Sequence, residues 1–330
     1  MDDGQPAAAG GMSGLDPLLS SAENYRRFAQ REAAGRSPAY EALAQSVAAD
    51  DVILSYLETL PVEKRQPNLL FAAARFVLDV VPTVDDLRTL ALAPGVLREV
   101  MMQRRTQTNE AARCATLLPA LCQLPQPLAL IEVGASAGLT LLPDRYSYDY
   151  DGHRVTGLDP AAPVLSCTIQ GPAPLPTRVP DVAWRCGLDL NPLDPTDVGD
   201  ANWLQCLVWP GSEDRSERLR SALEVARRAP VPIRRGDLVD DLTALVAEVP
   251  PEIATTVVFH SAVLAYVDHA KRSAFADLVQ RLGVHWLSNE APGVLPVSAG
   301  DGGQGFRLVE NGHSVLAHTD PHGTWLNWTT

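Results

Sequence analysis

The spacing of apolar residues along the chain changes near residue 127. Between Asn24 and Cys122, apolar residues recur at intervals of about three to four residues, the period of an amphipathic helix. Prolines separate these segments, and the pattern predicts a bundle of about five or six helices. We expect the last of them to run from about Val96 to Leu121.

After residue 127, short apolar runs alternate with helical segments. Such an alternation predicts an α/β fold in which a doubly wound, mostly parallel sheet is covered by helices. The expected strands are 128–133, 182–190, 231–235, 255–259 and 284–287, and the expected helices are 138–145, 213–229, 238–249 and 270–282.

Two segments have the alternating pattern of β-hairpins. Tyr146 to Thr156 alternates around Asp151-Gly152, and the C-terminal segment alternates around Asn311-Gly312, both strong turn signals. The proline-rich stretch between the first two strands predicts an irregular insertion. The predicted organisation is a disordered tail (1–18), an N-terminal helical cap domain (19–127) and a Rossmann-like domain (128–330) with an insertion at about 146–181 and a terminal antiparallel hairpin.

Composition narrows the classes of partner. The formal net charge of −13 and the lack of a Lys or Arg run argue against nucleic acid, so we expect a small-molecule substrate. No apolar run approaches the roughly 20 residues of a membrane span, and the acidic N-terminus is unlike a signal peptide. The five cysteines contain no C-x-x-C pair, which argues against disulfides or a zinc cluster. These features predict a cytoplasmic location; they do not predict the oligomeric state.

The sequence LALIEVGASAGL, from Leu128 to Leu139, matches two kinds of active-site signature. Glu132 is followed by Gly134, Ser136 and Gly138, and such small residues let the backbone approach a ligand and open a helix whose amides can face a carboxylate. The same residues also form G-x-S-x-G, the nucleophile elbow of α/β-hydrolases.

Three polar residues follow the next strands and should meet this loop at one edge of the sheet. Asp189 and Asp237 can accept hydrogen bonds from the ribose hydroxyls and the adenine amino group of an adenosyl cofactor. His260 is the best-placed general base if the acceptor is a hydroxyl, a phenol or a ring nitrogen. The alternative for His260 is a histidine whose hydrogen bonds are satisfied at a strand end.

The order EVGASAGL, GLDLNP, RGDLVDDL, FHSAVLAYV resembles the core of class I S-adenosylmethionine-dependent methyltransferases over residues 128–330. With QTNEAARC and DRYSYDYDG included, nearly the whole chain is similar to a bacterial, mainly actinobacterial, family of domains of unknown function. The resemblance implies S-adenosylmethionine as cofactor. It implies that Asp189 holds the ribose and that Asp237 lies near the adenine. The cofactor loop it implies consists of Glu132, Gly134, Ser136 and Gly138.

The sequence departs from the methyltransferase pattern at three points. Ser136 replaces the usual central glycine, and a long insertion separates the first strand from Asp189. The tetrapeptide Asn-Pro-Pro-Tyr of amino-group methyltransferases, or its Asp variant, is also missing after strand four, where the sequence is His260-Ser261-Ala262-Val263. The resemblance therefore implies the cofactor and does not imply a particular methyl-transfer reaction.

Further residues are candidates for a substrate pocket. Glu110 and Arg113 are three residues apart, so on a helix they share a face that can supply contacts to a ligand, or simply a solvated stripe with an internal ion pair. The pocket candidates are Asn109, Glu110, Arg113, Tyr266 and Glu290, and the candidate wall residues are Trp203, Trp209 and Arg215. For the two tryptophans, packing in the hydrophobic core is an equally good explanation.

Other functions remain open at this point. A serine hydrolase would use Ser136 with Asp237 and either His260 or His285, but a helical first half lacks the strands and oxyanion segment that precede such an elbow. The spacing of a nicotinamide-binding G-x-G-x-x-G is not present. His313, His318 and His322 lack a helical metal-binding pattern. The sequence therefore predicts methyl transfer from S-adenosylmethionine to a small molecule, with a non-catalytic adenosyl-ligand or metabolite-binding protein as the alternative.

Overall fold

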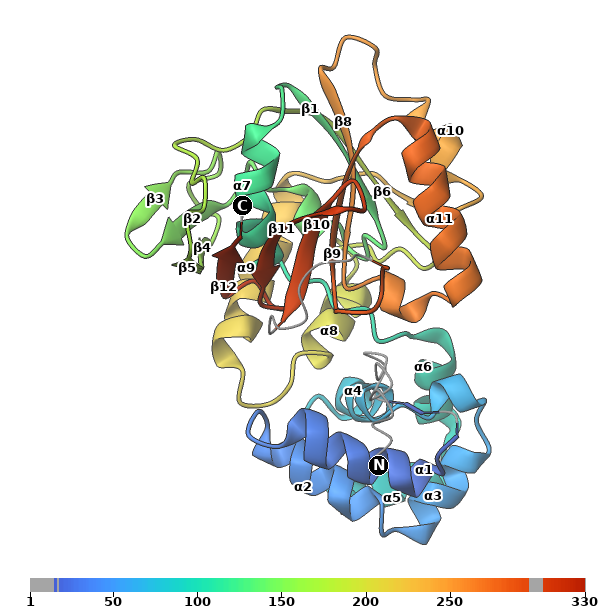
Figure 1. Ribbon diagram of the computed structural model, residues 1–330. Helices are drawn as coiled ribbons and strands as arrows, with labels where there is room; N and C mark the ends of the chain where they lie inside the picture. The colour runs from blue at the N-terminus through green and yellow to red at the C-terminus, as the bar shows by residue number, and fades with distance from the viewer. Residues whose placement is uncertain (1–14, 17, 297–304, 330) are drawn as a thin grey trace, which may run out of the picture. The chain divides into compact units, whose positions relative to one another are not determined.

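The chain forms two compact units. The computed structural model describes residues 15, 16, 18–296 and 305–329 (Figure 1). The first unit contains residues up to Thr108 together with Val198–Glu217, and the second contains Asn109–Asp197 and the residues from Arg218 onward. The sequence predicted a single division near residue 127. Most of the predicted tail, residues 1–14 and 17, lies outside the described residues.

The first unit is helical in its described part. Ser20 and Thr83 each form a capping box at the start of a helix, and Ser37 caps another that has proline at its first position. Its elements are α1 (Ser21–Phe28), a π-helical turn η1 (Ala29–Ala33), α2 (Pro38–Val47), α3 (Asp51–Glu58), the 3₁₀ turn η2 (Val62–Lys64), α4 (Pro67–Leu78), α5 (Val84–Leu92), α6 (Gly95–Gln103) and α8 (Val198–Cys206).

Aromatic side chains pack the interior of the first unit. Phe71 of α4 lies against Tyr25, Phe28 and Tyr40, with ring centroids 4.9 to 6.0 Å apart. The two predicted pocket tryptophans belong to the same unit. Trp209 contacts Phe28 and Tyr40, and Trp203 contacts Phe76, so both serve as packing residues there.

The second unit is built on a nine-stranded sheet in the order β5-β12-β11-β10-β9-β8-β1-β6-β7. The neighbouring strands β7, β6, β1, β8 and β9 pair in parallel. The strands β9, β10, β11 and β12 pair antiparallel. Its strands are β1 (Leu128–Val133), β5 (Thr168–Gln170), β6 (Val182–Asp189), β7 (Ile233–Arg235), β8 (Thr255–Ser261), β9 (His285–Glu290), β10 (Phe306–Glu310), β11 (Ser314–Thr319) and β12 (Trp325–Trp328).

A small sheet and several helices complete the second unit. The predicted hairpin around Asp151-Gly152 is confirmed, and its two strands join a third in the order β3-β2-β4. The elements are α7 (Arg113–Gln123), the 3₁₀ turn η3 (Leu139–Leu141), β2 (Ser147–Tyr150), β3 (His153–Val155), β4 (Val164–Ser166), α9 (Glu213–Arg228), which belongs to this unit from Arg218 onward, α10 (Leu242–Val246), the 3₁₀ turn η4 (Leu264–Tyr266) and α11 (His269–Leu282).

The strand order reverses at β1. The chain runs outward from β1 to β6 and β7, then returns to the other side of β1 for β8 and β9. Because parallel crossovers are right-handed, α9 lies on one face of the sheet, and α10 and α11 lie on the other. The loops after β1, β6, β7, β8 and β9 all leave from one edge, which we call the carboxyl edge.

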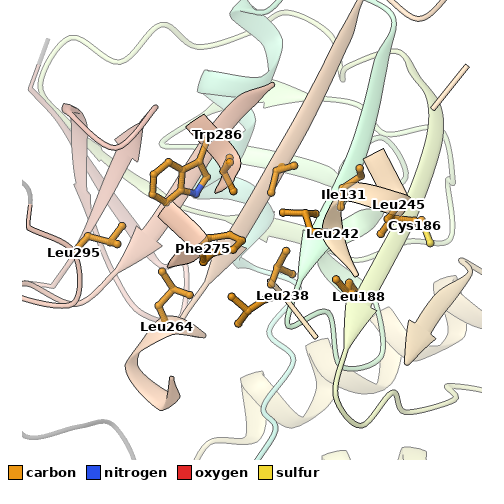
Figure 2. Close-up of a cluster of buried hydrophobic side chains, with 13 residues drawn as sticks. Ile131, Cys186, Leu188, Leu238, Leu242, Leu245, Leu264, Phe275, Trp286 and Leu295 are labelled. Carbon is orange, nitrogen blue, oxygen red and sulfur yellow. The ribbon is translucent and has the colours of Figure 1, made fainter. Parts of the chain in front are cut away.

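The core between the sheet and helices α10 and α11 is shown in Figure 2. In this core, Trp286 of β9 lies beside Phe275 of α11, and Cys186 of β6 lies beside Leu245 of α10. Each side chain in the cluster is at least nine-tenths buried, so the cluster fixes the strand ends that form the carboxyl edge. In the described part of the chain, no helix is long and apolar enough to cross a membrane.

Two predicted helices are wrong. The segment 138–145 contains only the turn η3 before β2, because Gly138 has a left-handed φ of 72° and Pro143 follows closely. The predicted helix 96–121 is divided into α6 and α7 by the non-helical segment 104–112. In that gap, the carbonyls of Arg104 and Arg105 accept hydrogen bonds from Lys64 Nζ and Trp203 Nε1. A continuous helix would need those carbonyls for its own ladder.

Candidate functional site

The loop after β1 is built from small residues in an unusual backbone conformation. Gly134, Ser136 and Gly138 have φ of 72°, 52° and 72°, so alternate residues are left-handed. A Cβ on Gly134 would lie only 2.5 Å from the side chain of Val263, which belongs to the loop after β8. The glycine is therefore required both by its φ and by this close approach. The contact brings the loops after β1 and β8 together.

Glu132, near the end of β1, is a buried acid with one unused oxygen. Its side chain is 4% exposed, Oε1 accepts a hydrogen bond from Thr140, and Oε2 has no hydrogen-bond partner. Burial raises the pKa of Glu132 to about 8; the Asp189 carboxylate adds to this rise, and Thr140 and Arg113 oppose it. A buried polar oxygen without a partner is costly in either protonation state, so a ligand group that forms a hydrogen bond with Oε2 would be favoured there.

Asp189, the last residue of β6, joins three loops of the carboxyl edge. Its Oδ2 accepts from the Ser136 amide at 2.8 Å and its Oδ1 from the Asn191 amide at 2.7 Å. Its backbone carbonyl accepts from the Gly236 amide at 3.0 Å. The Ser136 hydroxyl beside it is buried and has no partner. The predicted proximity of Glu132, Ser136 and Asp189 is therefore observed.

Asp237 lies after β7 and forms an ion pair with Lys271 of α11. Burial favours a higher pKa, but hydrogen bonds from Lys271 and the Val239 amide, with the lysine charge, hold the pKa of Asp237 below its usual value. The carboxylate is therefore ionised and anchored. Nothing in the sequence pattern pointed to Lys271 as its partner.

The residues Asn109 to Arg113 form a buried support beneath the loops. Asn109 Oδ1 accepts from the Leu139 amide at 2.8 Å, which holds the end of the small-residue loop. Arg113 donates from Nη1 to the Ser261 carbonyl and from Nε to the Pro321 carbonyl, both at 2.9 Å. The sequence predicted that these residues share one face of a helix. That prediction is wrong, because Asn109 and Glu110 precede α7, which begins at Arg113. The polar groups of this segment are directed to the backbone of neighbouring loops.

His260 occupies the core rather than an open position. It is fully buried; Nε2 accepts from Trp286 Nε1 at 3.0 Å, and Nδ1 lies 2.7 Å from Glu290 Oε1. Because an indole nitrogen can only donate, Nε2 is the acceptor and Nδ1 carries the hydrogen. Both ring nitrogens are engaged in this arrangement, which leaves neither to take a proton from an acceptor.

Glu290 is the last residue of β9, and Tyr266 belongs to the segment that follows β8. Glu290 Oε1 also accepts from the amides of Val263 and Leu264 at 2.8 and 3.0 Å, so this carboxylate fixes the loop. Tyr266, in η4, is half exposed. Of the two, only Tyr266 presents a substantial surface to a ligand.

The groups of the alternative hydrolase are not assembled. The Ser136 hydroxyl has no hydrogen-bond partner, and His260 is held by Trp286 and Glu290. His285 begins β9, so it lies at the opposite edge of the sheet from Ser136. Among the described residues, no group of three or more His, Cys, Asp or Glu side chains is arranged to hold a metal ion.

The comparisons with known proteins give a family. A family model described as "Uncharacterized protein conserved in bacteria (DUF2332)" matches residues 22–80 and 85–328. The chain belongs to this family. The match includes most of both units, so the helical unit is part of what the family shares. No curated protein and no solved structure matches the chain.

Proposed function

We propose that this DUF2332 protein binds S-adenosylmethionine at the carboxyl edge and transfers its methyl group to a small-molecule acceptor. The observation that carries the proposal is the loop after β1. It lies where the strand order reverses, the position at which open α/β sheets bind ligands. The buried Glu132 Oε2 and Ser136 Oγ have no partner there, beside the carboxylate of Asp189.

The residues at this edge suit an adenosyl ligand. Glu132 Oε2 can accept from an amino group, and the Asp189 carboxylate at the end of β6 is of the kind that accepts from a ribose hydroxyl. Asp237 stands at the next strand end, where the resemblance implies the adenine. When bound, S-adenosylmethionine supplies an electrophilic methyl group, and the protein's part is to orient the acceptor and exclude water.

The proposal assigns no general base to His260. In this fold, His260 positions Glu290, which in turn holds Val263 and Leu264 in the loop that faces Gly134. His260 therefore acts as a positioning residue. The methyl acceptor then either reacts without losing a proton first or loses its proton to a group other than His260.

Ligand binding tests the cofactor assignment directly. We expect S-adenosylmethionine and S-adenosylhomocysteine to raise the melting temperature of the wild-type protein, and isothermal titration calorimetry to give a single site. Asp189→Ala should abolish both responses, because it removes the ribose acceptor and releases the Ser136 amide. Asp194→Ala, which removes an acid that bonds locally to Thr196 on the same loop, is the matched control. A wild-type protein that responds to neither nucleoside would overturn the cofactor assignment.

Turnover separates an enzyme from a binding protein on the same fold. The purified protein, incubated with S-adenosylmethionine and a small-molecule extract as the source of acceptor, should release S-adenosylhomocysteine. Asp189→Ala should release none. Binding without release from any extract would favour the non-catalytic alternative.

A further inference from the structure

Arg218 of α9 donates a hydrogen bond from Nε to Glu110, while its Nη2 group has no hydrogen-bond partner. Its side chain is only 17% exposed, and Nε donates to Glu110 Oε1 at 2.9 Å. Glu110 is itself buried and its Oε1 also accepts from the Ala112 amide. The guanidinium is therefore fixed in orientation by a carboxylate that is held from a second direction.

The Nη2 group of Arg218 is buried and has no hydrogen-bond partner. A guanidinium carries five N–H donors in a rigid fork that matches carboxylates, and buried donors are nearly always satisfied. The ion pair with Glu110 uses Nε and leaves the Nη2 donors for another acceptor. Such a half-used, oriented guanidinium is a receptor for an oxyanion.

Arg218 lies close to the proposed cofactor loop. Its partner Glu110 follows Asn109, whose side chain accepts from the Leu139 amide at the end of that loop. The neighbours Asn109 and Glu110 therefore connect the end of the proposed cofactor loop with Arg218.

The loop itself lacks the usual alternative for binding an anion. The sequence predicted that the amides of a helix at 138–145 would face a carboxylate, but only the 3₁₀ turn η3 follows Gly138. A single short turn has little dipole and few free amides to offer. An anionic ligand group at this edge consequently needs another partner, and Arg218 is a partly buried cation whose Nη2 group has no acceptor.

We propose that Arg218 binds a carboxylate of the ligand through Nη2. The inference rests on the proposed function in so far as it places the ligand at this edge. The carboxylate has two possible sources, the amino-acid end of the cofactor or a carboxylate on the acceptor. Glu110 is a positioning residue that orients the guanidinium.

Two nucleosides distinguish these sources by calorimetry. S-adenosylhomocysteine has the amino-acid carboxylate, and 5′-methylthioadenosine lacks it. If the cofactor supplies the carboxylate, Arg218→Met should weaken S-adenosylhomocysteine binding about tenfold or more and leave 5′-methylthioadenosine binding unchanged. Arg218→Lys keeps the positive charge but loses the forked guanidinium. Its affinity for S-adenosylhomocysteine should lie between those of the wild type and Arg218→Met. Arg227→Met removes an arginine paired with Glu224 on the same helix and should bind both nucleosides as the wild type does.

The remaining outcomes also decide the proposal. If Arg218→Met binds both nucleosides normally, benzoate is titrated into the protein saturated with S-adenosylhomocysteine. A thermal shift in the wild type that Arg218→Met loses assigns the carboxylate to the acceptor, and equal responses overturn the proposal. If the wild type binds neither nucleoside, the cofactor assignment has failed. Benzoate with the nucleoside-free protein then tests Arg218 alone, and equal melting curves for wild type and Arg218→Met would reject the anion site.

Discussion

At the scale of single residues, the burial of Glu132 gives the protein a specific pH dependence. Burial raises the pKa of this carboxyl from 4.5 to about 8 in the folded chain, so folding favours the protonated acid. Below pH 4.5 the acid is neutral in both states. Between 4.5 and about 8 the unfolded chain loses the proton first, and the stability falls by up to about 1.4 kcal/mol per pH unit.

Glu132→Gln should remove this loss. Urea unfolding at several pH values should show the variant gaining stability relative to the wild type as the pH rises through this window, because the amide does not ionise. Glu224→Gln, which removes an acid from the surface of α9, serves as the control for the loss of one charge. Stability curves of wild type and Glu132→Gln that run parallel from pH 4.5 to 8 would contradict a buried, neutral Glu132.

The sequence placed Glu132, Ser136 and Asp189 together because all three lie at the ends of recognisable parallel strands. It could not show that His260 is enclosed, because β8 extends to Ser261 and the indole of Trp286 comes from a strand much later in the chain. Likewise, Arg218 looked like one of many charged residues on α9. Its unused donors are visible only once Glu110 is placed against it.

At the scale of elements, the loops after β1 and β8 meet at Gly134. We therefore expect alanine to cost more stability at Gly134 than at Gly283. Gly134→Ala forces a side chain into a left-handed conformation, at about 1–2 kcal/mol, and drives its Cβ into Val263. Gly283→Ala in the cap of α11 has a similar φ of 64° but open space around it. The first variant should therefore lose about 1–3 kcal/mol more than the second in chemical denaturation. It should also lose nucleoside binding, which Gly283→Ala should keep. Equal stabilities would show that Val263 moves aside without cost.

Strands were easier to predict than helices in this chain. β1 was predicted residue for residue, and both hairpin turns were found, because an apolar run or an Asp-Gly or Asn-Gly pair identifies them locally. The predicted helix at 138–145 failed because a left-handed Gly138 and Pro143 leave no room for one. The helix from Val96 was divided at residues whose carbonyls bind distant side chains, and no local pattern records such partners.

At the scale of the whole molecule, the units do not follow the order of the chain. Helical periodicity continues to Cys122, so the sequence predicted one boundary near 127; the first unit ends earlier and takes back Val198–Glu217. The returning segment contributes to the core of that unit. Trp203 packs against Phe76, and the Val208 carbonyl accepts from Arg75 at 2.6 Å. A chain of residues 109–330 alone would therefore contain α8 without the helices of the first unit against which it packs.

A shortened chain tests this division. Residues 109–330 should expose the apolar side chains of the returning segment, which are buried in the full chain: Trp203, Leu204, Leu207 and Val208. We expect this chain to bind the dye 8-anilinonaphthalene-1-sulfonate strongly and to self-associate on gel filtration. Replacing 199–211 with a Gly/Ser linker should reduce both effects, because the second unit keeps its own sheet and core. If the linker variant unfolds while the shortened chain with α8 stays monomeric, α8 stabilises the second unit, and the division is wrong.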